Sequence, residues 1–167
     1  HQAGLVPFIP FYKETIDSSG QPLPKYYSNI QSDSFNIRVA QNLFMRTSWR
    51  DTMYRRILQS PLGPANKYIY SDNDFIFLGK VVEAISGLPL NEYAKKKFYL
   101  PLGLTAEGFR PREFLPANRI APTEQESQFR LQLIRGDVHD PGAAMFGGVS
   151  GHAGLFSDAY DLGVICQ

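Results

Sequence analysis

Hydrophobic side chains recur at helical spacing in four stretches of the chain, and each stretch lies between residues that start or stop helices. The spacing predicts helices over about residues 49–59, 73–86, 89–98 and 158–166. We expect loops over residues 1–36, packed by aromatic side chains, and mostly irregular chain over 101–156. Strand signals are weak throughout. The pattern therefore predicts a mainly α protein with long loops.

The second of these helices has the clearest pattern. Ser71 or Asp72 can cap its start, and Gly87 stands where a left-handed residue would end it. Its apolar stripe predicts a buried face. That face consists of Phe75, Leu78, Val82 and Ile85.

The other three helices are predicted on similar grounds. Ser48 is a plausible cap for the first, and Pro61 would end it. The side chains expected inside are Leu90, Tyr93, Ala94 and Phe98 in the third helix and Ala159, Leu162, Ile165 and Cys166 in the fourth. Cys166 is then a small core residue rather than a reactive thiol.

The amino-acid composition excludes several classes of protein. The 167 residues suffice for one domain with its own core. The 17 basic and 16 acidic residues give a formal net charge of +1, which argues against a nucleic-acid or anionic-membrane protein. One cysteine excludes an internal disulfide framework and a multi-cysteine zinc module. No apolar run approaches the roughly 20 residues that a membrane span needs.

Familiar catalytic motifs are incomplete in this sequence. The run Gly148-Val149-Ser150-Gly151-His152 fails the Gly-x-Ser-x-Gly pattern at its last position. His139-Asp140 and His152 could ligate a metal, but they lack a His-x-x-x-His or cysteine partner, so a structural role is favoured. Glu124 and Glu126 are interpreted as loop surface. No metal and no cofactor is predicted.

The segment before the second helix carries the most chemical information. Tyr70 comes just before the predicted helix start and is followed by the polar run Ser71-Asp72-Asn73. A tyrosine hydroxyl, with a pKa of roughly 10, becomes a useful base near neutral pH only beside a positive charge. On physical grounds alone, a helix cap next to a buried aromatic ring is the simpler interpretation.

At these residues the chain resembles the serine beta-lactamase and penicillin-binding-protein superfamily, especially its esterase-like, class C-like branch. Four segments carry the resemblance, in the family's order. They are His1–Leu5, Tyr70-Ser71-Asp72 for Tyr-x-Asn, Pro101-Leu102-Gly103-Leu104 for Pro-Leu-Gly-Met, and Gly151–Ser157. The sequence of residues 136–140 and 147–157 resembles that of a domain appended to family 3 glycoside hydrolases. Those hydrolases are beta-N-acetylglucosaminidases of Bacteroides-type bacteria.

The resemblance implies the helical subdomain of the α/β beta-lactamase/DD-peptidase-like fold, with residues 1–167 as a single partial domain. Tyr70 would help to activate the nucleophile or protonate the leaving group. Asp72 occupies the position of an asparagine that orients substrate, and an ionised Asp can only accept hydrogen bonds, which weakens the case for beta-lactam turnover. His152 falls in the middle segment, where a structural role is expected.

Two family motifs do not occur in the sequence, the Ser-x-x-Lys of the nucleophile and the later Lys/His-x-Gly. We interpret this as truncation at both ends and expect an inactive piece of a serine hydrolase that acts on an ester, an amide or a cell-wall peptide. Its partners would be that small-molecule or cell-wall substrate and the rest of its own domain, in the bacterial envelope or periplasm. The alternative is a noncatalytic glycan- or peptide-binding module. A metal-dependent hydrolase using His139, Asp140 and His152 is a third, weaker hypothesis.

Overall fold

The computed structural model describes residues 3–64 and 66–167. The helices are η1 (Phe11–Glu14), α1 (Thr47–Leu58), α2 (Asp72–Ser86), α3 (Leu90–Ala94), η2 (Lys95–Tyr99), η3 (Pro111–Glu113), η4 (Ala117–Arg119), α4 (Pro141–Met145) and α5 (Ala159–Ile165). The strands are β1 (Tyr27–Ser28), β2 (Ile37–Ala40), β3 (Leu43–Met45), β4 (Gly108–Phe109), β5 (Pro122–Gln125), β6 (Leu133–Arg135) and β7 (Leu155–Phe156). Helices contribute 36% and strands 15%, so the chain is helix-rich but less purely α than expected.

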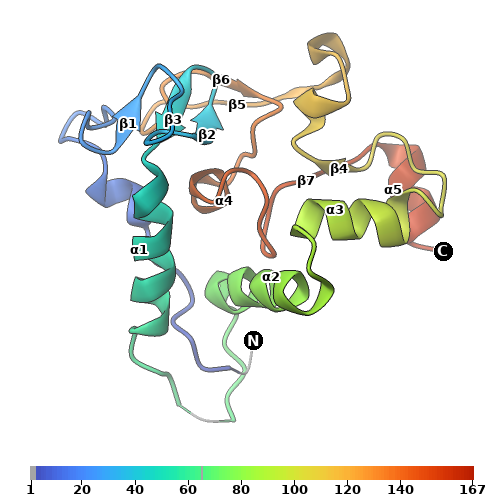
Figure 1. Ribbon diagram of the computed structural model, residues 1–167, viewed down its shortest axis with the longest axis horizontal. Coiled ribbons are helices and arrows are strands. Elements are labelled where there is room, and N and C mark those ends of the chain that lie inside the picture. The colour runs from blue at the N-terminus through green and yellow to red at the C-terminus, as the bar shows by residue number, and fades with distance from the viewer. Residues whose placement is uncertain (1–2, 65) are drawn as a thin grey trace.

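The strands form small antiparallel sheets, which the sequence pattern does not predict. One sheet has the order β1-β3-β2, and the others are the pairs β4-β7 and β5-β6. Each strand is two to four residues long, too short for an alternating pattern to be recognised. Figure 1 shows the three-stranded sheet and the β5-β6 pair at one end of α1, with α4 in the middle of the molecule and α2 below it.

The hydrophobic core lies between the three-stranded sheet, α1 and α4. α4 packs against β2 and against η1. Met45, Met53, Ile57 and Met145 are completely buried there. Phe129, from the turn between β5 and β6, closes the core against the rings of Tyr12 and Tyr27. Segments far apart in the chain thus share one core, which contributes the largest favourable term in folding.

The predicted helices all form, although their details differ. α1 begins at Thr47 with no side-chain cap, so the proposed Ser48 cap is wrong. α2 begins as predicted, because the Ser71 hydroxyl accepts a hydrogen bond from the Asp74 amide (3.2 Å). Gly87 ends this helix in the left-handed conformation (φ 69°), also as predicted.

The predicted buried face of α2 is wrong. Leu78 is 51% exposed and Ile85 is 84% exposed. The buried positions of this helix are instead Asn73, Asp74, Ile76 and Gly79. The polar and small side chains face inward because a glycine-rich loop packs against this side of α2, as described below. Periodicity identifies the helix, but it cannot say which face has a neighbour.

The third and fourth predicted helices also bury less than expected. The third continues from α3 into a π-helical turn, η2, whose wider winding brings Tyr99 inside and leaves Phe98 52% exposed. In α5, Leu162 is 53% exposed, and Cys166 after it is also exposed. The prediction of Cys166 as a core residue is therefore wrong.

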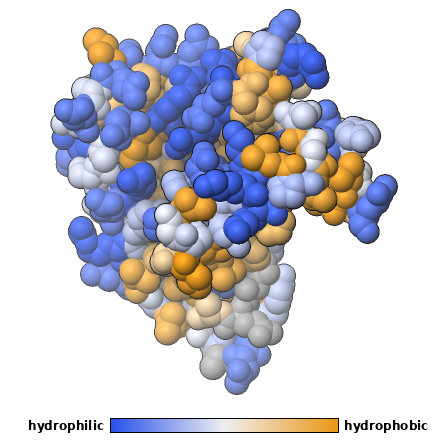
Figure 2. All heavy atoms as spheres, turned by 45° about the vertical axis from the view of Figure 1, so that its right-hand side comes forward, coloured by the Kyte–Doolittle hydropathy of each residue, from blue (hydrophilic) through white to orange (hydrophobic). Residues whose placement is uncertain are grey.

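Many large hydrophobic side chains lie on the surface. Figure 2 shows them gathered in the lower and right-hand parts of one face, while the upper left is mostly hydrophilic. Leu78 and Val81 of α2 and Leu162 and Ile165 of α5 are among them. Among the described residues, no helix combines the length and the apolar character that crossing a membrane requires.

Candidate functional site

The start of α2 is fastened to the N-terminal segment of the chain. The Ser71 hydroxyl and the Asn73 side-chain amide both donate to the backbone oxygen of Val6, at 3.1 Å and 2.7 Å. The Asp72 amide donates to the backbone oxygen of Pro7 (2.9 Å). The bond of Asp72 satisfies a backbone amide that a helix start leaves without an intrahelical partner, and the two side-chain bonds tie the residues on either side of Asp72 to the N-terminal segment.

The two predicted site residues lie at this fixed point. Tyr70 immediately precedes the cap residue, and its side chain is 66% exposed. Asp72 is the first residue of α2 and is half-buried. A carboxylate in the first helical turn is favoured by the helix dipole. The exposure of Tyr70 contradicts the simpler interpretation of a buried aromatic ring, while the capping half of that interpretation is confirmed for Ser71.

A glycine-rich loop, residues 147–154, closes against the inner side of α2. A Cβ atom on Gly151 would lie only 2.0 Å from the backbone oxygen of Phe75 and 3.1 Å from the amide of Gly79. A Cβ on Gly79 would in turn lie 3.3 Å from the Gly151 amide. The two backbones approach this closely because neither residue has a side chain. The loop therefore supports α2 one turn after the predicted site.

Two residues of this loop, Ser150 and His152, form a chain of hydrogen bonds with Asp140. The Ser150 hydroxyl lies 2.8 Å from Nδ1 of His152, and Nε2 of His152 lies 3.1 Å from Oδ1 of Asp140. The two ring nitrogens of His152 are exchanged relative to a catalytic triad, in which Nε2 contacts the serine and Nδ1 contacts the aspartate. Ser150 is 8% exposed and the His152 side chain 5%. This group connects the loop to α4 and does not present a nucleophile.

Asp140 anchors the same group to α4. Its carboxylate caps the helix by accepting from the Ala143 amide (2.6 Å). Burial raises the pKa of Asp140, but the hydrogen bonds from His152 and Ala143 outweigh this effect and bring the pKa below its usual value. The structural role expected for His152 agrees with this geometry.

His139 belongs to a different set of contacts. Its Nδ1 lies 3.2 Å from Glu124, and its backbone oxygen accepts from the Arg130 guanidinium (2.6 Å). Arg130 also donates to the Val138 oxygen (2.6 Å). Within the described residues, no group of three or more His, Cys, Asp or Glu side chains is placed to hold a metal ion. The structure does not bring His139 and His152 together as the metal hypothesis requires.

Glu126 has an important role that the sequence analysis missed. We expected loop surface, but Glu126 is 9% exposed and accepts hydrogen bonds from the backbone amides of the four residues 128–131. Burial raises the pKa of the Glu126 carboxyl, but the four amides together outweigh burial and bring the pKa below its usual value. No sequence signal distinguishes Glu126 from exposed Glu residues, because its donors belong to the backbone.

The sequence was compared with protein families and with known proteins. The family model described as "Beta-lactamase" matches residues 1–166. Putative D-alanyl-D-alanine carboxypeptidases of Salmonella schwarzengrund and Salmonella paratyphi B are 40% identical over 147 residues, 79% of this chain and 33% of each relative. The chain thus spans about a third of the length of these curated relatives.

Solved structures agree on the fold. The octameric penicillin-binding protein homologue from Pyrococcus abyssi superimposes with a TM-score of 0.55 and 20% identity, over 99% of this chain and 32% of that one. D-amino acid amidase from Ochrobactrum anthropi SV3, complexed with L-phenylalanine amide, gives 0.51 and 14%, over 97% and 39%. These likenesses show a fold of the penicillin-binding-protein type. With the match over residues 1–166, they place the chain in the beta-lactamase family.

Proposed function

We propose that the protein is a serine hydrolase that cleaves a peptide or amide bond by acyl transfer, with Tyr70 in proton transfer and Asp72 in substrate orientation. The observation that carries this proposal is the fixed start of α2. Three backbone-directed hydrogen bonds and a close-packed glycine loop hold it, while the Tyr70 side chain remains 66% exposed. A rigid support beneath an exposed polar side chain is what a catalytic group requires.

The proposed reaction needs a nucleophile that these 167 residues do not supply. A serine activated by a lysine would attack the carbonyl carbon, and the serine proton would pass to the basic groups of the site. The C–N bond then breaks, the departing amine takes a proton from the Tyr70 hydroxyl, and Tyr70 regains a proton from the basic group that received the serine proton. Water hydrolyses the resulting ester and restores the serine. We infer that this serine and lysine lie elsewhere in the protein, since the chain spans 33% of the carboxypeptidase relatives.

The names of the relatives suggest the substrate class. The relatives that are 40% identical carry the name putative D-alanyl-D-alanine carboxypeptidase. We propose a peptide substrate ending in a D-amino acid, which would place the protein in the bacterial cell envelope. A fused beta-N-acetylglucosaminidase remains a further proposal. It predicts hydrolysis of a chromogenic N-acetylglucosaminide by the full-length protein, and a reading frame without a glycosidase domain would contradict it.

The test is a pair of tyrosine variants in the full-length protein. Tyr70→Phe removes only the hydroxyl, whereas Tyr68→Phe makes the same change at a tyrosine with similar exposure (67%) two residues earlier. Release of D-alanine from a peptide ending in D-alanyl-D-alanine should fall by about 10²–10⁴-fold in Tyr70→Phe and remain near wild type in Tyr68→Phe. Equal activity of the two variants would refute the assignment of Tyr70.

The isolated chain provides a second test. Without a nucleophilic serine, it should not be acylated by a fluorescent penicillin, whereas the full-length protein should be. Stable labelling of the isolated chain would show that the nucleophile lies within these residues and would contradict this part of the proposal.

A noncatalytic binding module remains the second candidate, because one cavity favours it. This cavity, of about 500 Å³, lies between β2, η3 and the end of α4. Its lining includes Arg38, Arg50, Arg110 and Arg112, of which Arg38 pairs with Asp137 (2.7 Å) and Arg110 lies 3.6 Å from Glu113. Guanidinium groups bind carboxylates well, which favours an acidic peptide over a neutral glycan. Binding of such a peptide that survives Tyr70→Phe but is lost in Arg50→Gln, in a protein without Ser-x-x-Lys, would support this alternative.

A further inference from the structure

Glu107 is a buried carboxylate whose charge is not balanced within the described part of the chain. The residue is 6% exposed, and neither of its carboxylate oxygens has a hydrogen-bond partner among the described residues. Removing an ionised carboxylate from water without a compensating partner is strongly unfavourable. Buried polar groups are almost always satisfied in folded proteins, so this exception requires a physical explanation.

The backbone around Glu107 is held in place. The amides of Thr105, Ala106 and Glu107 all donate to one oxygen of Asp161 in α5, at 2.9, 2.7 and 3.0 Å. Asp161 is itself 2% exposed, so this contact lies inside the protein. The carboxylate of Asp161 is therefore satisfied by backbone donors, and the same bonds prevent the segment from turning Glu107 out into solvent.

Glu107 lines a cavity of about 390 Å³ between α3, η2 and β4. Its apolar wall is made of Tyr99, Leu100, Leu104, Phe109 and Phe114. Phe114 packs directly on Gly108, where a Cβ atom would come within 3.1 Å of the ring, and Gly108 has a positive φ of 156°. The cavity thus combines an aromatic wall with a buried anion.

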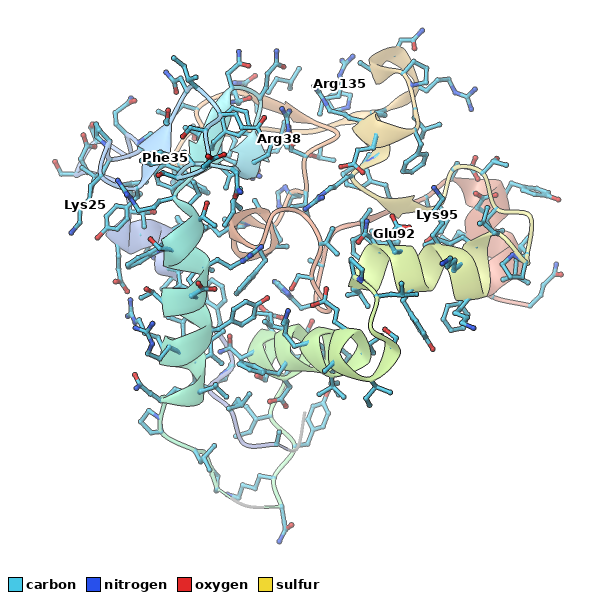
Figure 3. The ribbon with its side chains drawn as sticks, viewed as in Figure 1. Lys25, Phe35, Arg38, Glu92, Lys95 and Arg135 are labelled. Atoms are coloured by element: carbon cyan, nitrogen blue, oxygen red, sulfur yellow. The ribbon has the colours of Figure 1, made fainter. Side chains whose placement is uncertain are left out.

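The side chains that line the cavity carry more negative than positive charge. Glu92 and Glu113 line it with Glu107, Lys95 supplies the one ammonium group of the lining, and Glu113 lies 3.6 Å from the Arg110 guanidinium. Figure 3 shows Glu92 of α3 and Lys95, the first residue of η2, on the side that faces β4. The Lys95 ammonium does not hydrogen-bond to Glu107, because both Glu107 oxygens lack a partner among the described residues. Burial, and then the charge of Glu107, raise the pKa of Tyr99, which keeps that phenol neutral.

We propose that this cavity binds the ammonium group of an organic amine with an aromatic or aliphatic body, with Glu107 as its counter-ion. A primary ammonium supplies the donors that the two oxygens lack, and a cation is also attracted to aromatic faces. A metal ion is disfavoured, since the described side chains include no cluster of three potential ligands. Tyr70 does not line this cavity, so the site is separate from the proposed hydrolytic site.

The experiment compares a charged probe with its neutral analogue in the full-length protein. Benzylammonium chloride and benzyl alcohol have the same ring and differ in the charged group. In titration calorimetry, the wild type should bind benzylammonium saturably and benzyl alcohol at least about tenfold more weakly. Glu107→Gln should weaken benzylammonium binding at least about tenfold, while Glu124→Gln, a matched change outside the cavity, should leave it unchanged.

A stability measurement separates binding from a merely structural role. Glu107→Gln removes an unbalanced buried charge and keeps the shape, so the ligand-free variant should unfold at a higher urea concentration than the wild type. Loss of binding together with this gain supports the proposal. Equal benzylammonium affinity in wild type and Glu107→Gln would overturn it, as would no binding to the wild type up to about 10 mM. A lower urea midpoint for Glu107→Gln would also overturn it, because Glu107 would then have an internal partner.

Discussion

Replacing Gly151 with alanine tests the contact that supports the proposed hydrolytic site. The new Cβ would lie 2.0 Å from the backbone oxygen of Phe75, whereas ordinary contacts begin at 3.4 Å, so one backbone must move by about 1.4 Å. Overpacking typically costs about 1–3 kcal/mol when side chains can adjust. Here the obstacle is a helix carbonyl, and we expect a loss of stability of about 3 kcal/mol. That corresponds to a decrease in Tm of about 6–12 °C for a domain of this size.

Two further glycines serve as controls for this measurement. A Cβ on Gly163 of α5 would meet nothing within 4 Å. Gly163→Ala should therefore be neutral or stabilise by up to about 1 kcal/mol, because alanine favours helix. Gly79→Ala should fall between the two, since the approach of 3.3 Å offsets the gain in helix propensity. Thermal unfolding by circular dichroism gives the order, and a Tm for Gly151→Ala equal to that of Gly163→Ala would refute the contact.

Three other predictions concern ionisable and reactive side chains. His152→Ala should destabilise the protein by about 1–3 kcal/mol, because it leaves Ser150 and Asp140 without their shared partner, and urea unfolding at neutral pH measures this. Glu126 has a lowered pKa in the folded state, so its contribution is present above the usual carboxyl pKa and is lost as the pH falls through the folded value. Glu126→Gln should accordingly destabilise at pH 7 and have little effect at about pH 2, whereas an equal loss at both pH values would contradict this account. Cys166 is exposed, so native protein should react with a thiol reagent as fast as unfolded protein, and strong protection would show that Cys166 is covered.

The helices were predictable because their signals are local. Ser71 caps α2 through an amide three residues later, and Gly87 ends it through its own backbone preference. The buried face of α2 was not predictable, since its neighbour is Gly151, 72 residues after Gly79. The strands were not predicted, because each has too few residues for the alternation of apolar and polar positions to be recognised.

The candidate site likewise contains residues that the sequence proposes and residues whose role only the structure shows. Tyr70 and Asp72 are candidates that the sequence proposes, and the structure adds the hydrogen bonds of Ser71 to Val6 and of Asp72 to Pro7. Glu126 and Glu107 could not be singled out, because burial and partners decide what a carboxylate does. The partners of Glu126 are backbone amides, and the main property of Glu107 is the absence of a partner among the described residues.

By itself, the sequence determined the helix positions, the capping residues of α2 and the motifs that resemble the beta-lactamase family, because each depends on residues a few positions apart. Only the tertiary structure decided which helix faces are buried, that Ser150, His152 and Asp140 form one hydrogen-bonded group, and that Glu107 carries a charge without a partner among the described residues. The physical reason is that solvation and packing act between segments distant in the chain. The same carboxylate or leucine has a different free energy in water and beside a neighbour.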